Sequence, residues 1–171
     1  TENGIHQVQV GNDRIESERV YLNVGTRAMI PPIDGLADVD SLDNVKLMAL
    51  TELPDHLVIL GGSYIGLEIG QIFRRFGSEV TIIERSPRVA FREDEDISAE
   101  IERIMVEEGI TILTDYSAKQ VQQDGNSVTV TIAKSDGHTM DVSGSHLLVA
   151  AGRIPNTDTL NLDAIGLDTD K

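Results

Sequence analysis

Cysteine is absent from this chain of 171 residues. Its absence excludes a disulfide framework, a thiolate zinc site and any thiol chemistry carried by the chain itself. Histidine is also scarce. The four histidines, His6, His56, His138 and His146, are isolated in the sequence and lack the close spacing of metal ligands. We therefore expect no metal site, and we expect these histidines to be surface residues or satisfied residues of the core.

The chain also has few positively charged residues. The chain has 14 lysines and arginines against 29 aspartates and glutamates, which gives a formal net charge of -15 at pH 7. An acidic surface repels phosphate groups, so nucleic acid and anionic membranes are poor partners for it. No apolar run approaches the ~20 residues needed to span a bilayer. We expect a cytoplasmic protein with no nucleic-acid or membrane partner.

The first part of the chain predicts two strands and a connector. Residues 5–10, "IHQVQV", alternate in polarity, and "GND" after them is typical of a turn. The second strand is predicted in "RVYLNVG", residues 19–25, which is rich in valine, tyrosine and leucine. Pro31 and Pro32 then favour an extended connector and mark the best candidate for a domain boundary.

From Leu57 the pattern predicts alternating strands and helices. A buried strand at 57–60 leads into a glycine loop and a helix that ends at Gly77, and "EVTII" follows as a second strand. Apolar residues recur at helical spacing from Ile97 to Met105, which predicts a helix over about 97–108, before a third strand in "ITIL". Such repetition is typical of a parallel sheet built from βαβ units.

The last third of the chain predicts a different arrangement. The short alternating runs "AKQVQQ", "SVTVTIA" and "TMDV" are separated by "DGN" and "SDGH" turns, which indicates an antiparallel β-meander. A final apolar strand, "HLLVAAG", follows. We therefore predict an α/β, Rossmann-like FAD/NAD(P)-binding domain whose parallel sheet carries a small antiparallel meander.

The stretch "LVILGGSYIGLEIG", residues 57–70, joins the first buried strand to its helix through clustered glycines. In the fingerprint G-x-G-x-x-G, the first glycine makes the turn, the second leaves room for a pyrophosphate, and the third allows close packing. Gly61 and Gly66 take the first and third positions, Ser63 the second, and Gly62 lies between. Serine is small and its hydroxyl is able to donate to a phosphate, so the loop still predicts a dinucleotide site.

Two other interpretations of the loop are weaker. The glycines alone are able to serve only a tight turn and close helix packing, but the strand, loop, helix, strand and acid together form the full context of a cofactor site. A serine-hydrolase elbow, G-x-S-x-G, needs glycine at position 65, where the chain has Ile65.

Glu84 at the end of the next strand bears on which dinucleotide is bound. The acid that accepts the adenosine ribose hydroxyls typically follows the first glycine by about 20 residues. Glu84 follows Gly61 at close to this spacing. The 2′-phosphate of NADP would meet this carboxylate as a like charge, costing about 4 kcal/mol at 4 Å near a surface. Arg85 and Arg88 are able to grip a 2′-phosphate, although they also suit a solvated surface. NAD(H) is favoured over NADP(H).

Residues 57–88 closely resemble the NAD(P)-binding domain of the pyridine nucleotide-disulfide oxidoreductases. The flanks add to the resemblance: "YLNVGTRAMIPPIDG" is similar to the family's stretch that closes the first half of the FAD domain, and "LLVAAGRIPNT" to the stretch that returns to it. Around "IPPIDGL" and "ERSPR" the chain is most similar to the mercuric reductases and dihydrolipoamide dehydrogenases of that family.

The resemblance implies a set of residues that bind cofactor. Tyr64 matches the family's aromatic gate over the flavin, and Glu68 matches a glutamate near the nicotinamide. Tyr64 otherwise suits packing at a helix start, Glu68 suits the helix dipole, and Arg153 suits the surface. The full set is Gly61, Gly62, Ser63, Tyr64, Ile65, Gly66, Glu68, Glu84, Arg85, Gly152 and Arg153, with Thr26 on the FAD side.

The resemblance also implies a parent enzyme larger than this chain. Residues 1–40 would be the trailing segment of an FAD domain with its proline linker, 41–149 the NAD(P)-binding domain, and 150–171 the return segment. We expect FAD, a redox cysteine pair and a dimerisation domain elsewhere in a homodimeric parent, and no catalytic residue or activity in this chain alone. Two alternatives stay open: an NADH oxidase-type flavoprotein, and a standalone NAD-sensing module.

Overall fold

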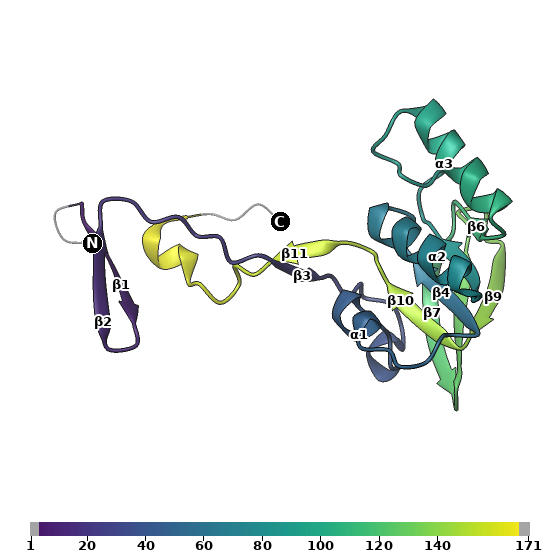
Figure 1. The fold of residues 1–171 in the computed structure, drawn as a ribbon, viewed down its shortest axis with the longest axis horizontal. Coiled ribbons are helices and arrows are strands. Elements are labelled where there is room, and N and C mark those ends of the chain that lie inside the picture. Colours follow the sequence, from purple (N-terminus) through teal and green to yellow (C-terminus); the bar gives the residue numbers. More distant parts are fainter. Residues whose placement is uncertain (1–3, 168–171) are drawn as a thin grey trace. The chain divides into compact units, whose positions relative to one another are not determined.

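A four-stranded parallel sheet lies at the centre of the larger of two units in the computed structural model (Figure 1). The structure describes residues 4–167, apart from the side chain of residue 165. The larger unit runs from Ala28 to Ile154, and the smaller unit takes the chain up to Arg27 and from Pro155 onward.

The strands of the parallel sheet lie in the order β10, β4, β5, β6. They span His146–Val149 (β10), His56–Leu60 (β4), Glu79–Ile83 (β5) and Thr111–Leu113 (β6). A parallel sheet covered on both faces needs apolar side chains on both, and β4 meets this need: Leu57, Val58 and Ile59 have no exposed surface. The predicted α/β fold with a parallel sheet is confirmed.

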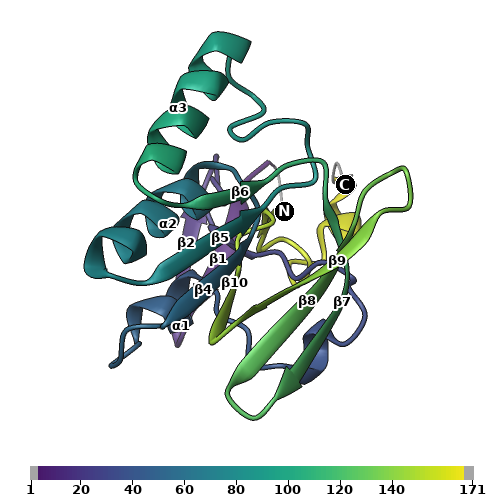
Figure 2. The ribbon, with the colours of Figure 1, turned by 90° about the vertical axis from the view of Figure 1, so that its right-hand side faces the viewer.

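Alternate residues of β4 point to opposite faces, so the sheet carries two separate cores. On one face, Leu57 and Ile59 belong to a cluster with residues of helices α2 (Tyr64–Phe76) and α3 (Glu95–Glu107). On the other face, Val58 and Leu60 cluster with the antiparallel strands. These are β7 (Ser117–Asp124), β8 (Ser127–Ala133) and β9 (Thr139–Gly144), paired in that order (Figure 2). The predicted meander is confirmed as the second layer.

Helix α2 packs closely on the sheet because glycines lie at its contact face. Gly66 and Gly70 are buried, and a Cβ atom on Gly70 would lie 3.1 Å from Ile82 Cδ1. The helix ends at Gly77, which adopts the left-handed conformation with φ 113° and donates its N–H to the carbonyl of Arg74 at 3.1 Å. The predicted end of this helix is therefore confirmed.

Two short elements after the prolines were not predicted, the 3₁₀ turn η1 (Leu36–Asp38) and helix α1 (Asn44–Met48). Their buried leucines, Leu36 and Leu47, are 2% and 4% exposed. Single backbone bridges add to this packing, from Asp34 to β7 and from Leu42 to β10. The segment is therefore held by tertiary contacts within the larger unit, because a helix this short gains little stability from its own hydrogen bonds.

Asp43 caps α1, and its replacement is expected to destabilise the larger unit. Its Oδ1 accepts the N–H groups of Val45 and Lys46, each at 2.8 Å. We expect Asp43→Ala to lower the free energy of unfolding by about 1 kcal/mol, and Asp43→Asn to lower it less, because asparagine also caps well. Denaturant midpoints of the three proteins measure this. Equal losses in both variants would contradict a capping role.

The same cap predicts a pH dependence. The Lys46 N–H, and to a smaller extent the Val45 N–H, hold the pKa of the Asp43 carboxyl below its ordinary value of 3.8. A lowered folded-state pKa adds stability above the unfolded value, and this is lost as the pH falls through the folded value. The stability difference between the wild type and Asp43→Asn is therefore expected to shrink below about pH 4. A difference that stays constant from pH 7 to pH 3 would argue against it.

The smaller unit shows where one strand prediction was wrong. Strand β1 (His6–Val10) is present as expected, but its partner is β2 (Asp13–Ser17), not residues 19–25. Val10 pairs with Asp13 across a turn at Gly11, so the chain reverses within two residues and the next residues pair at once. Further on, β3 (Thr26–Ala28) pairs with β11 (Arg153–Pro155), and η2 (Leu162–Ile165) follows.

Candidate functional site

The loop between β4 and α2 has a backbone that only glycine fits. Gly61 has φ 114°, and a Cβ atom there would lie 2.4 Å from the carbonyl oxygen of Ala150. A Cβ atom on Gly66 would lie 1.9 Å from the carbonyl oxygen of Gly61. The first and third fingerprint positions are therefore tied to each other and to the end of β10. The loop is a tight turn that leaves bare backbone at the start of α2.

Ser63 is the N-cap residue of α2, and its hydroxyl makes no capping hydrogen bond to the helix. The residue is exposed, and its backbone is extended, with φ −93° and ψ −175°. The first N–H groups of α2 thus have no cap from this side chain. A helix start of this kind presents donors and the positive end of a dipole, which suits an anion.

Glu84 is held against the glycine loop by its own carboxylate. Its Oε2 accepts the N–H of Gly62 at 2.7 Å, and its Oε1 accepts the N–H of Ser86 at 2.7 Å. Gly62 is buried so closely that an added Cβ atom would lie 3.0 Å from both Glu84 Cβ and Val89 Cγ1. An ionised carboxylate has about four acceptor sites, so about two remain for hydroxyl groups of a ligand.

A hollow of about 830 Å³ opens at the carboxyl ends of the strands of the sheet. It brings together nine of the predicted residues: Gly61, Gly62, Ser63, Tyr64, Ile65, Glu84, Arg85, Gly152 and Arg153. Three predicted residues are not in its lining. Gly66 is buried at the helix start, Glu68 lines a neighbouring groove, and Thr26 belongs to the smaller unit.

The lining of the hollow is basic, although the chain is acidic. Arg85, Arg92 and Arg153 line it, and Glu84 is the one acidic residue among its lining residues. The whole chain has a formal net charge of -15. A local excess of guanidinium groups beside a helix N-terminus therefore sets this surface apart, and it favours a ligand with phosphate groups.

Several lining residues were missed by the sequence predictions. Phe91 and Arg92 come from the segment between β5 and α3, Tyr116 from the connection after β6, and Ser117 from the start of β7. The residues near β6 had a usable signal, because loops after neighbouring parallel strands meet at one edge of the sheet. The other missed residues are Met29, Pro31, Ile33, Leu60, Ile83, Ser86, Ala118, Ala150 and Ala151.

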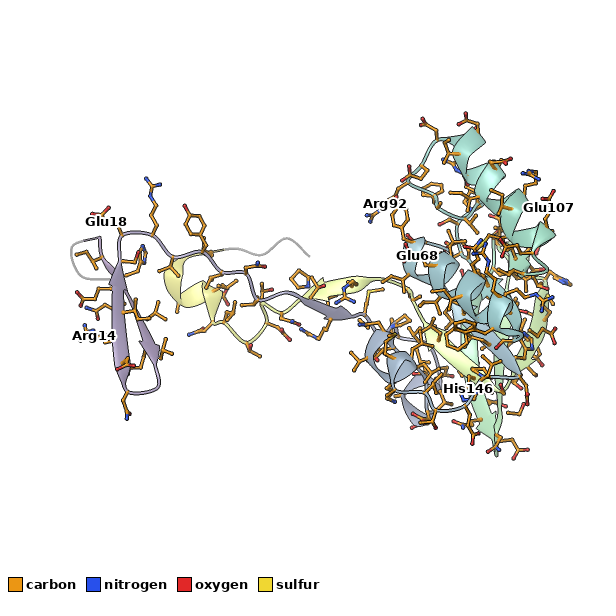
Figure 3. The ribbon with its side chains drawn as sticks, viewed as in Figure 1. Arg14, Glu18, Glu68, Arg92, Glu107 and His146 are labelled. Carbon is orange, nitrogen blue, oxygen red and sulfur yellow. The ribbon has the colours of Figure 1, made fainter. Side chains whose placement is uncertain are left out.

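Tyr64, the first residue of α2, donates its hydroxyl to Glu93 Oε1. The accepting carboxylate raises the pKa of Tyr64 above its ordinary value of 10.0. Tyr64 also borders a smaller groove between α2 and α3, lined by Leu67, Glu68, Gln71, Ile101, Ile104 and Met105. In Figure 3, Glu68 lies on α2 and Arg92 on the segment before α3.

Within the described part of the chain, no group of three or more histidine, aspartate or glutamate side chains is placed to hold a metal ion. A search of the same residues for a helix long and apolar enough to cross a membrane also found none.

Comparison with known proteins places these features in a family. The family model described as "Pyridine nucleotide-disulphide oxidoreductase" matches residues 2–171. A mercuric reductase of Streptomyces lividans is 43% identical over 93% of this chain and 33% of its own length. A dihydrolipoyl dehydrogenase of Halobacterium salinarum is 34% identical over 92% of this chain and 33% of its own length.

A solved structure of a flavoprotein disulfide reductase is also similar to this chain. The HOCl-induced flavoprotein disulfide reductase RclA from Escherichia coli, in its Cu(II) complex, has a TM-score of 0.83 and 33% identity. The similarity covers 97% of this chain and 37% of that one. The chain thus spans about a third of the length of the curated relatives it matches.

Proposed function

The chain belongs to the pyridine nucleotide-disulphide oxidoreductases, and we propose that it binds NADH in the hollow at the carboxyl ends of the sheet. One observation carries the proposal. Gly61 and Gly66 leave no room for a Cβ atom, and the helix start they shape lies beside a lining rich in arginine. Bare backbone, helix-start N–H groups that the Ser63 side chain does not cap, and guanidinium groups together suit a pyrophosphate.

The residues of the hollow fit the other parts of a dinucleotide as well. Glu84 retains about two acceptor sites for the hydroxyls of the adenosine ribose, which favours NADH over NADPH. Gly152 and Arg153 line the hollow beside the glycine loop, and Tyr64 stands at its helix start, where the nicotinamide end would lie. A volume of about 830 Å³ falls within the range of small-molecule and cofactor sites.

In this proposal the chain binds and orients, and the bound cofactor supplies the redox chemistry. NADH supplies a hydride when bound. The backbone of the loop fixes the pyrophosphate, Glu84 fixes the adenosine end, and the position of Tyr64 limits how the nicotinamide end lies. None of these residues needs to gain or lose a proton for this role.

The parent enzyme belongs to the same proposal. We retain the expectation of an FAD-dependent disulfide oxidoreductase, with residues 1–40 and 150–171 joining its FAD domain and 41–149 binding NADH. FAD, with Thr26 on its side, a homodimeric parent and a cytoplasmic location stay predictions. Relatives named as mercuric reductases and dihydrolipoyl dehydrogenases favour the disulfide oxidoreductase over the NADH oxidase-type and sensor alternatives.

Titration of the 171-residue chain with NADH, followed by cofactor fluorescence, tests the proposal. We expect saturable binding of one NADH per chain, and weaker binding of NADPH because its 2′-phosphate faces Glu84. Folded chain that shows no saturable binding would overturn the proposal. Transfer of hydride to added FAD would favour the flavoprotein functions, whereas tight binding with a conformational response and no transfer would favour the sensor.

A further inference from the structure

The glycine loop is joined to the segment after β5 at three points. Two of them are inner contacts that involve the backbone of buried Gly62: its N–H donates to Glu84, and its carbonyl accepts the N–H of Ala90 at 2.8 Å. The third is an outer contact between two side chains, Tyr64 and Glu93. The inner pair holds the backbone of the loop. The outer contact, between Tyr64 and Glu93, is therefore available for a role in ligand binding.

Glu93 sits on a segment that is braced without help from Tyr64. Its N–H donates to the carbonyl of Ala90 at 2.8 Å. The Arg88 guanidinium donates to the carbonyls of Phe91 and Glu93 at 3.4 and 3.3 Å, and lies 4.9 Å from the centre of the Phe91 ring. Val89, in the same segment, is fully buried. The backbone that carries the Glu93 side chain is therefore held by its own segment, without help from Tyr64.

Tyr64 has much less to hold it. Its side chain belongs to the first turn of α2, the residue is 53% exposed, and it borders both the hollow and the groove between α2 and α3. Within the described residues, Glu93 is the hydrogen-bond partner of its hydroxyl. Without that bond, the exposed ring is free to exchange among staggered rotamers.

We propose that Glu93 is a positioning residue that holds Tyr64 in the conformation that accepts the nicotinamide end of the dinucleotide. This inference rests on the proposed function of the hollow. Glu93 does not touch the ligand; it acts by removing in advance the rotamer freedom that Tyr64 would lose on binding. Ordering one side chain of this kind lowers the affinity about three- to tenfold, and the loss concerns only ligands that reach Tyr64.

Electrostatics alone predicts the opposite change in NADH affinity, so it is distinguishable from positioning. Removing a negative charge beside a site for an anionic dinucleotide should strengthen binding. Positioning instead predicts that Glu93→Gln weakens NADH binding although it removes a negative charge. Tyr64→Phe, which leaves every charge in place, should weaken it by a similar factor. Asp94→Asn is the matched control, since Asp94 lies next to Glu93, makes no side-chain cap to α3 and does not line the hollow.

The experiment compares NADH with ADP-ribose, which lacks the nicotinamide, on the wild-type chain and these three variants. We expect NADH binding about three- to tenfold weaker in Glu93→Gln and Tyr64→Phe, and ADP-ribose binding unchanged in both. Asp94→Asn should leave NADH binding equal or slightly tighter. Unchanged or tighter NADH binding in Glu93→Gln would overturn the inference alone. Failure of the wild type to bind either ligand would overturn the proposed function, and the inference with it.

A second readout needs no ligand. In protein labelled at tyrosine Cζ, the resonance of Tyr64, identified by its loss in Tyr64→Phe, should titrate above the ordinary pKa of 10.0. Glu93→Gln should move this pKa back toward 10.0, and Asp94→Asn should not. A Tyr64 pKa that does not respond to Glu93→Gln would show that the bond is absent in solution, which also overturns the inference.

Discussion

Replacing Gly66 with alanine is expected to abolish NADH binding and to lower the free energy of unfolding by about 3 kcal/mol. The added Cβ atom would lie 1.9 Å from the carbonyl oxygen of Gly61 and 3.1 Å from its carbonyl carbon. Both are backbone atoms of the same loop, so no rotamer change relieves the clash. The loop has to move away from α2, and its backbone then no longer cradles the pyrophosphate. Denaturant unfolding and NADH titration measure the two effects.

Gly70→Ala in the same helix is the matched control. Its Cβ atom would meet Ile82 Cδ1 at 3.1 Å, the far end of a flexible side chain, and the other near atoms are also side-chain carbons. Alanine also has a helix propensity about 1 kcal/mol better than glycine, which offsets the crowding. We expect Gly70→Ala to fold and to bind NADH like the wild type. Equal damage by both substitutions would show that the effect of Gly66→Ala is crowding of the helix and not the loss of the loop.

The sheet and its main helices were predictable because their signals are local. The apolar run of β4, the glycines after it and Gly77 at the end of α2 each act within a few residues of the chain. Helix α1 was not predictable in this way. Its five residues are held by a cap at Asp43 and by the burial of Leu47, and burial depends on strands far along the chain.

The error in the first hairpin has a related cause. Residues 19–25 were predicted as a strand because valine, tyrosine and leucine are enriched in strands, while the true partner, "DRIES", has one apolar residue. Propensity in strands reflects packing against neighbours more than the backbone itself. The two-residue turn after Val10 was the stronger signal, since it leaves Asp13 directly opposite and continues the pairing to Ser17.

Some features of the candidate site were also predictable from the sequence, and others were not. The fingerprint positions and Glu84 were predictable from spacing, and they do lie around one hollow. The hydrogen bonds from Gly62 and Ser86 to Glu84 were not, because a carboxylate at a strand end gives no sign in sequence of what it accepts. Arg92 was missed because its place in the lining of the hollow depends on how the long segment between β5 and α3 folds.

Those hydrogen bonds add a structural role to the ribose contact that we propose for Glu84, and Glu84→Gln is expected to damage both. Glutamine has one acceptor oxygen and one NH₂ donor, so it cannot accept the N–H groups of Gly62 and Ser86 on separate oxygens as the carboxylate does. One N–H is left facing a donor, which lowers the free energy of unfolding by about 1–3 kcal/mol. The loss of charged hydrogen bonds to the ribose, worth about 1.5–3 kcal/mol, weakens NADH binding by about ten- to a hundredfold.

The cofactor preference separates the ligand role of Glu84 from its structural role. Distortion of the loop alone weakens NADH and NADPH equally, because both share the pyrophosphate. Loss of the negative charge helps only NADPH, whose 2′-phosphate no longer meets a like charge. We therefore expect the ratio of NADH to NADPH affinity to fall at least about tenfold in Glu84→Gln. Glu79→Gln, at the exposed opposite end of β5, removes the same charge far from the hollow and should leave the ratio unchanged. An unchanged ratio in Glu84→Gln would mean that Glu84 shapes the loop without contacting the ribose.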